Sequence, residues 1–188
     1  RILRVGLRAM LYTCARRAKS ARANVGISQE FVNVTLRKFR AEQYWDSPHN
    51  IQLLDQMPRL FGSPGQKPPA ANMTFYRVFV GPGTAFERDG IKIPIDFPDG
   101  CANTILVVEA GDAVLWTKLD EITYAPNHPL PELGGMFLTH NWLGRPGPSR
   151  GFTAAFADAS IRWFPRSTPE ATIRAYITRN GGEKIEGP

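Results

Sequence analysis

Five oxygen-bearing side chains in the second half of the chain are the best candidates for holding a metal ion. Asp96, Asp99 and Asn103 lie in one short stretch, with Glu109 just beyond it, and Asp158 could join them across a sheet. Calcium takes about six to eight oxygen ligands, so it is the cofactor that this set would suit. The spacing differs from a dedicated D-x-D-x-D-G loop, and Asp99 and Asn103 are also typical of turns closed by side chains. Both interpretations stay open, and apart from calcium we expect no cofactor.

Large aromatic side chains are the candidates for binding an organic ligand. Trp116, Trp142 and Trp163, with His140 nearby in the sequence, could line a groove for a sugar or a peptide. Further aromatic residues could extend this groove: Trp45, Phe75, Tyr76 and Tyr124. In a small domain such residues also form the core and its rim, and the sequence does not decide between the two.

The three histidines and two cysteines form no recognisable catalytic pattern. His49, His128 and His140 show no i, i+4 pair, and the chain has no G-x-S-x-G elbow and no P-loop lysine. Cys14 and Cys101 belong to no C-x-x-C pair, which excludes a cysteine zinc site and leaves a disulfide open. We therefore expect a protein that is not an enzyme.

Positive charge is concentrated at the start of the 188-residue chain. Residues 1–40 hold ten Lys and Arg against one acid, a net charge of +9, whereas the remainder carries −3. This segment predicts an arm for anionic partners such as nucleic acid, acidic lipid or an acidic protein surface. The alternative is the solvated face of a helix. No apolar run reaches the ~20 residues of a membrane span, and no signal sequence is visible at Arg1.

The hydrophobic pattern predicts an α+β fold, with N-terminal helices followed by an antiparallel sheet and a C-terminal helix. Helices are expected over 2–22, 28–41 and 46–57, and over 169–179. Strands are expected over 74–80, 91–95, 104–109, 152–157 and 160–164, with 104–109 central. A Gly/Pro-rich loop at 61–72 follows the helical part. We divide the chain into a basic helical segment, residues 1–40, and a globular α+β domain, residues 41–188.

The last two strands should form a hairpin around Asp158 and Ala159. A two-residue type I′ turn needs positive φ at both positions, which costs of order 1 kcal/mol at Ala159. The pattern thus predicts either a strained Ala159 or a turn of another type. Alternation sends Phe152, Ala154 and Phe156 to one face of their strand.

Eight segments in register resemble the large prepilin-like family that is expanded in planctomycete bacteria. They cover about residues 36–184 and read WDSPHN (45–50), VGPGTAF (80–86), DGCANTI (99–105), VVEA (107–110), VLWTK (114–118), PLPELGG (129–135), FADASIRW (156–163) and ITRNGG (177–182). The prepilin helix itself is not among them. A stretch at 136–150 is additional to the family pattern.

The resemblance implies a pilin-like head and a location outside the cytoplasm or at the cell surface. It also implies a structural or interaction function, with other protein subunits as partners and self-assembly among the outcomes. The alternatives are an extracytoplasmic ligand-binding module that uses the Trp-rich groove, or a protein that binds anionic partners through residues 1–40.

Overall fold

The computed structural model describes residues 38–183, apart from 41, 64–65, 89, 119 and 141–145. The helix expected over 2–22, nearly all of the helix expected over 28–41, and Cys14 lie outside these residues, as does most of the basic segment 1–40. Within the described part, none of the helices has the length and hydropathy needed to cross a membrane.

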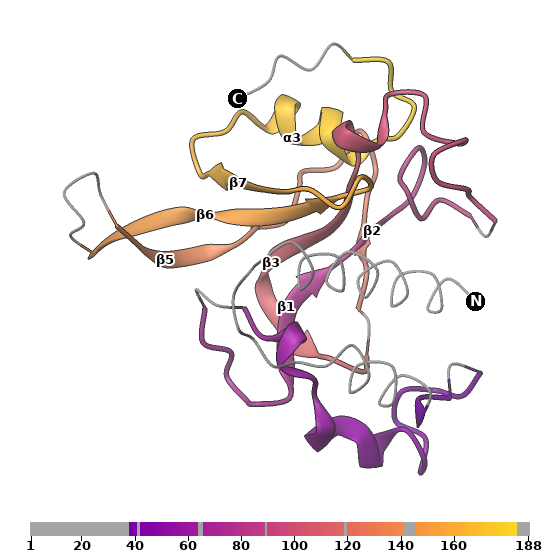
Figure 1. The fold of residues 1–188 in the computed structure, drawn as a ribbon, viewed down its shortest axis with the longest axis vertical. Helices are drawn as coiled ribbons and strands as arrows, with labels where there is room; N and C mark the ends of the chain where they lie inside the picture. Colours follow the sequence, from indigo (N-terminus) through magenta and orange to yellow (C-terminus); the bar gives the residue numbers. More distant parts are fainter. Residues whose placement is uncertain are drawn as a thin grey trace.

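An antiparallel sheet forms the centre of the described structure (Figure 1). Its described strands are β1 (Met73–Arg77), β3 (Ile105–Leu115), β5 (Gly135–His140), β6 (Pro146–Phe156) and β7 (Ile161–Pro165). β3 pairs with β1 on one side and β6 on the other, which confirms the central position predicted for 104–109. A parallel pair, β2 (Phe79–Val80) with β4 (Ile122–Thr123), lies outside this sheet.

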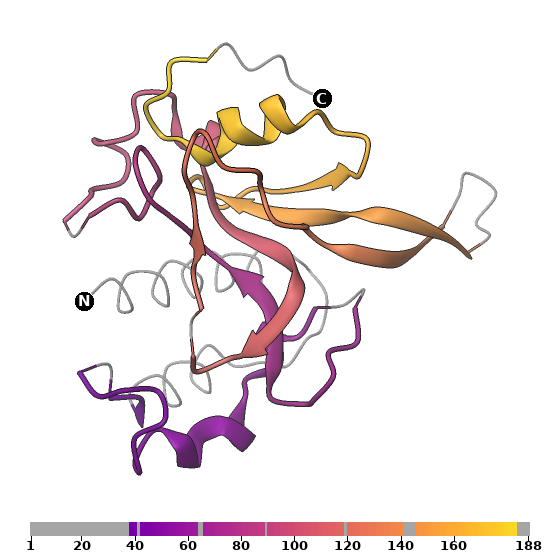
Figure 2. The same ribbon diagram turned by 180° about the vertical axis from the view of Figure 1, so that it is seen from behind.

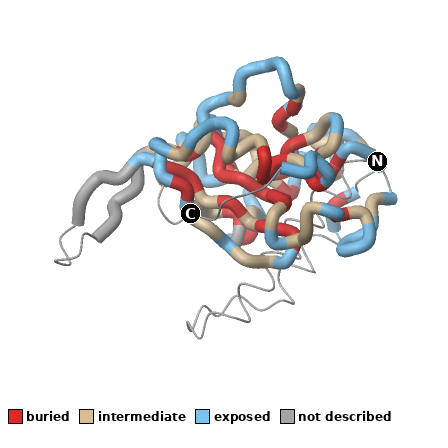
Figure 3. Tube along the Cα trace, turned by 90° about the horizontal axis from the view of Figure 1, so that it is seen from above, coloured by how far each residue is buried: buried red, intermediate tan, exposed pale blue. Residues whose placement is uncertain are grey.

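β3 is apolar from Ile105 to Val108, so side chains on both of its faces need to be buried. Other parts of the chain cover both faces of this stretch. On one face α3 (Glu170–Ile177) places Tyr176 and Ile177 in a cluster with Val108 and Phe156. The opposite face packs against the chain around η1 (Ile51–Gln56) and η2 (Arg59–Phe61). Figure 2 shows the same arrangement from behind, and Figure 3 shows the buried residues gathered inside the described body. The structure therefore has the α+β content expected from the sequence.

The C-terminal hairpin is confirmed, and its turn is not a two-residue type I′ turn. Phe156 N donates to Ser160 O and Ala159 N donates to Phe156 O, both at 2.9 Å, so the loop has three residues rather than two. In such loops a type I turn is followed by a residue in the left-handed region. Ala159 has φ 69° and is the only residue other than glycine with positive φ among those described. Both of the alternatives that the sequence left open are therefore present: Ala159 is left-handed, and the turn is of another type than I′.

The helix after this hairpin is shorter than predicted. The expected stripe is present, because Tyr176 and Ile177 are buried on the sheet and Ile173 packs beside them. The helix ends at Ile177 rather than near residue 179, and Thr178 instead forms a β-bridge with Thr84. Thr168 gives no side-chain cap, since its hydroxyl donates to Pro165 O.

Two expected strands are different in the structure. The stretch 74–80 is divided at Val78, so that β1 and β2 pair in different sheets. The strand expected over 91–95 is wrong: this stretch turns, with Asp96 Oδ2 accepting from Lys92 N at 2.7 Å and Asp96 N donating to Lys92 O. The helix expected over 46–57 is reduced to turns followed by η1.

A buried asparagine fixes the first described residues against the body. Asn50 is fully buried and its side chain bonds to both backbone groups of Arg40, at 3.0 Å each. Its amide also donates to Tyr44 O at 2.8 Å, and a ring nitrogen of His49 lies 2.8 Å from Lys38 O. The WDSPHN stretch therefore holds the chain where it enters the described fold.

Candidate interaction surface

Strand β7 separates buried from exposed side chains by simple alternation. Phe164 is buried, stacks on Phe152 at a centroid distance of 5.0 Å and lies against Tyr176. On the opposite face, Ile161 and Trp163 keep 36% and 38% of their surface exposed. Because β7 pairs with β6 and with no other described strand, this apolar pair lies at an edge of the sheet.

Arg162 lies between these two residues in sequence but on the buried side of β7. Its guanidinium is 4.3 Å from the centroid of the Phe156 ring and 5.5 Å from that of Tyr176, within the range of cation–π attraction. It also donates to Ala102 O at 2.7 Å. The side chain thus attaches β7 to the segment before β3 and fixes the position of the edge strand.

Next to this edge, β5 and the first half of β6 form a two-stranded hairpin that projects from the body (Figure 1). We call the paired residues 135–140 and 146–151 the arm; its register runs from Gly135↔Gly151 to His140↔Pro146. A Cβ added at Gly151 would lie 2.6 Å from Trp163 Cζ2, so the indole packs directly on the backbone at the base of the arm.

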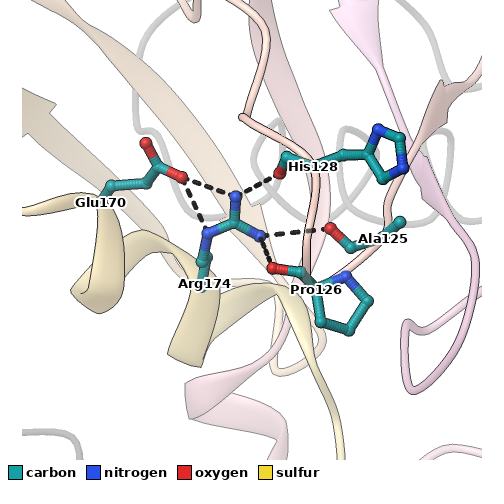
Figure 4. Close-up of polar contacts among 5 residues, drawn as sticks. All are labelled: Ala125, Pro126, His128, Glu170 and Arg174. Atoms are coloured by element: carbon teal, nitrogen blue, oxygen red, sulfur yellow. Dashed lines mark hydrogen bonds and ion pairs between the residues drawn. The ribbon is translucent and has the colours of Figure 1, made fainter.

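On the other side of the sheet, Arg174 fastens the Pro-rich segment after β4 to α3 (Figure 4). Its Nη1 lies 3.3 Å from Ala125 O and 3.2 Å from Pro126 O, and its Nη2 donates to His128 O. Glu170 accepts from Nε at 2.8 Å and from Nη2 at 2.6 Å, and this hydrogen bond raises the pKa of Arg174. All three guanidinium nitrogens form hydrogen bonds within the protein, so we assign this cluster a structural role.

Arg179 connects the chain after α3 to two loops. Its backbone N donates to Gly83 O at 2.8 Å, and its backbone O accepts from Asp99 N at 3.1 Å. The guanidinium donates to Asp96 O at 2.9 Å and to Glu87 Oε2 at 2.6 Å. The Arg179 hydrogen bond, with a second from Gly83 N–H, holds the pKa of Glu87 below its ordinary value. Neither contact was anticipated, because the sequence offered only a helical pattern here.

The aromatic candidates for a groove are not gathered at one place. Trp116 is 1% exposed, contacts Phe61 and donates its Nε1–H to Leu54 O at 2.9 Å, so it belongs to the core. Phe75 and Tyr124 are also buried. Trp142 lies outside the described residues, and for His140 the structure gives only its place at the end of β5. Trp45 and Tyr76 are half-buried. Of the four residues first proposed for ligand binding (Trp116, Trp142, Trp163 and His140), Trp163 is the one that the structure places, partly exposed, at the surface.

Three of the proposed metal ligands, Asp96, Asn103 and Asp158, close local turns, whereas Asp99 makes a long-range contact. Asp96 accepts from Lys92 N, and Asp99 accepts from Gly182 N at 3.2 and 3.3 Å. Asn103 donates to Asp99 O at 3.0 Å, and Asp158 accepts from Ser160 N at 2.8 Å. Among the residues described, no three His, Cys, Asp or Glu side chains are grouped as a metal site would require. The bonds of Asp96, Asn103 and Asp158 match the turn-closing alternative, and the Asp99 carboxylate instead joins the chain after α3 to this loop.

Two further residues with ionisable side chains, Cys101 and Glu109, also lie in or next to β3 and the short segment before it. Cys101 is a free thiol whose pKa is raised by burial and then by the charge of Asp158. Glu109 is 1% exposed in the middle of β3, where Ser63 Oγ donates to it at 2.7 Å. The signal for Glu109 was its place directly after the most apolar run of the chain.

Comparisons of the chain with protein-family models, curated proteins and solved structures give no significant match.

Proposed function

We propose that this protein is a structural, subunit-associating protein that acts through contacts rather than catalysis, with β7 and the arm as its contact surface. The observation that carries this proposal is the pair Ile161 and Trp163, which an edge strand exposes on one face beside a projecting hairpin. Edge strands favour pairing with a further strand, and tryptophan is enriched among the residues that dominate interface energies.

The expected partner is a second copy of the same chain. The resemblance to the prepilin-like family supports subunit assembly, a pilin-like head and a location outside the cytoplasm or at the cell surface. Because alternation along β7 presents the same apolar pair on each copy, a two-fold contact between edge strands would bring like surfaces together.

A charge substitution in this surface tests the proposal. Ile161→Lys should shift the protein toward monomer in size-exclusion chromatography with light scattering, measured from low to high micromolar concentration. The matched control is Ile95→Lys, which places the same charge on a more exposed isoleucine, 78% exposed, in the loop before the short 3₁₀ helix η3 (Cys101–Asn103). Circular dichroism checks that both variants are folded. A parent protein that stays monomeric, or equal effects of the two variants, would contradict the proposal.

A second proposal concerns the basic segment. The separation of a +9 segment from a −3 remainder supports binding of an anionic partner through residues 1–40. This activity would add to assembly rather than replace it.

A further inference from the structure

The base of the arm is built from glycines that allow very close approach of its two strands to each other and of β6 to β7. Gly134 has φ 65°, and a Cβ there would lie 1.9 Å from Gly151 O. A Cβ at Gly151 would lie 2.2 Å from Phe164 O. Glycine also leaves the backbone the most conformational freedom of any residue. Glycine at these positions does not by itself hold the arm in one direction, so its direction depends on contacts around its base, which include the hydrogen bond from Arg166 N to Arg150 O at 2.9 Å.

At this base, β6 changes its partner. Residues 154–156 of β6 pair with β3, whereas residues 146–151 of β6 pair with β5. Phe156 N bonds to Ser160 O on the β7 side, so alternation turns Thr153 N toward β3, where the ladder has already ended. The structure thus forks at Thr153, and one backbone N–H at the fork needs an acceptor other than a β3 carbonyl.

The side chain of Glu109 supplies that acceptor. Its Oε2 accepts from Thr153 N at 2.9 Å, while its own backbone carbonyl accepts from Gly134 N at 2.8 Å. One residue therefore bonds to both strands that lead into the arm. Its other carboxylate oxygen accepts from Ser63 Oγ on the loop after η2, which joins a third segment to the fork.

The burial of Glu109 indicates that its hydrogen bonds at the fork contribute to the stability of the fold. The Glu109 side chain is almost fully buried, and a buried carboxylate is costly unless it is hydrogen-bonded. Its bonds to Ser63 Oγ and Thr153 N are charge-assisted, which are stronger than bonds between neutral groups.

We propose that Glu109 is a positioning residue that holds the arm in one orientation. Without its carboxylate, Thr153 N loses its acceptor and the arm moves on Gly134 and Gly151 while the rest of the sheet stays paired. This inference deepens the proposed function, on which its biological meaning rests, because an arm held in one direction can present a repeatable contact to another copy.

Amide hydrogen exchange in the full chain tests the role of Glu109 independently of assembly. Glu109→Leu should speed exchange about tenfold or more in Thr153 and in the described residues of the arm, because a buried bond to a charged group is lost. Amides of Tyr176 and Ile177 in α3 should be unchanged. Glu109→Gln should largely restore slow exchange, since an amide oxygen can still accept from Thr153 N. Asp112→Leu, an exposed position farther along β3, is the matched control and should leave the arm unchanged.

Ser63→Ala is the milder variant for the case in which Glu109→Leu does not fold. It removes one of the two donors and should speed exchange in the arm to a smaller extent, again without an effect in α3. Unchanged exchange in the arm, or equal acceleration in α3, would overturn the inference. Light scattering on the same variants separates the two proposals: faster exchange in the arm with unaltered association would uphold the role of Glu109 and count against assembly through the arm.

Discussion

Ala159 has a backbone conformation that residues other than glycine, asparagine and aspartate rarely adopt. Two neighbours hold it there: Ala159 N donates to Phe156 O, and Asp158 Oδ1 accepts from Ser160 N. The cost of positive φ was predictable from the sequence, because Ala follows Asp where hairpins favour glycine. The three-residue loop was not, since it depends on the register of two whole strands.

Replacing Ala159 by glycine should be neutral or stabilise the protein by up to about 1 kcal/mol. The variant removes the cost of the left-handed conformation but gains entropy in the unfolded chain, which offsets part of the benefit. Urea melts give the free energy of unfolding. The matched control is Ala157→Gly in the same loop, which should be destabilised by about 0.5–1 kcal/mol or more. A loss at residue 159 as large as at residue 157 would contradict the role assigned to the left-handed position.

At the scale of elements, the sequence predicted correctly those strands and that helical stripe which depend on the pattern of neighbouring residues. The apolar run of β3, the alternation in β6 and β7, and the Ile173, Tyr176 and Ile177 stripe of α3 each depend on neighbouring residues alone. For Asp96, Asn103 and Asp158, metal ligation was the alternative to turn closure, and their side chains form turn contacts. The Asp99 carboxylate instead accepts from Gly182 N, far along the sequence.

The features that the sequence did not reveal depend on distant partners. The strand expected over 74–80 is interrupted at Val78 because its last two residues, β2, pair with β4, which lies some forty residues later in the sequence. Glu109 meets Thr153, and Glu87 meets Arg179, only after the sheet has formed. Alternation in 91–95 suggested a strand, but no strand lies beside it among the residues described, and Asp96 closes a turn instead.

The link between α3 and the preceding loops should weaken in acid through Glu87. Its pKa is lower in the folded protein, chiefly because of the Arg179 hydrogen bond, so the folded state binds fewer protons than the unfolded state. The stabilisation by the Glu87–Arg179 pair is therefore complete at a pH above the unfolded-state pKa of Glu87, about 4.3. It is lost as pH falls through the folded-state pKa of Glu87. Glu87→Gln should lower the free energy of unfolding at neutral pH, with a smaller difference from the parent near pH 3.

Urea melts across this pH range measure the effect, and Arg179→Met provides the control. In the Arg179→Met background, Glu87→Gln should have little pH-dependent effect, because the two residues act as a pair. An equal pH dependence in both backgrounds would assign the effect to another carboxylate.

For the whole molecule, the main feature is the division of charge between residues 1–40 and the rest. If the basic segment binds anionic partners, affinity for an anionic polymer should fall steeply with salt, because binding releases counterions. Replacing four basic residues by glutamine should weaken this binding at low salt: Arg16, Arg17, Lys19 and Arg22. Fluorescence anisotropy with a labelled polyanion measures it over a salt series.

The control removes the same charge from exposed positions elsewhere: Arg59, Lys67, Arg88 and Lys118. These substitutions should have the smaller effect. Binding that does not depend on salt, or equal losses in the two variants, would show that residues 1–40 are not the binding segment.

The contacts of Arg179 also set an order of events when the protein is made. Glu87 lies 92 positions before Arg179, and Asp96 lies 83 positions before it. A ribosome adds about 5–20 residues per second, so Glu87 waits roughly 5 to 20 seconds for its partner to be synthesised. The strands β1 and β3, by contrast, are complete long before that moment. On a nascent chain, the loops around Gly83 and Asp99 are therefore open to chaperones after the centre of the sheet is already available for folding.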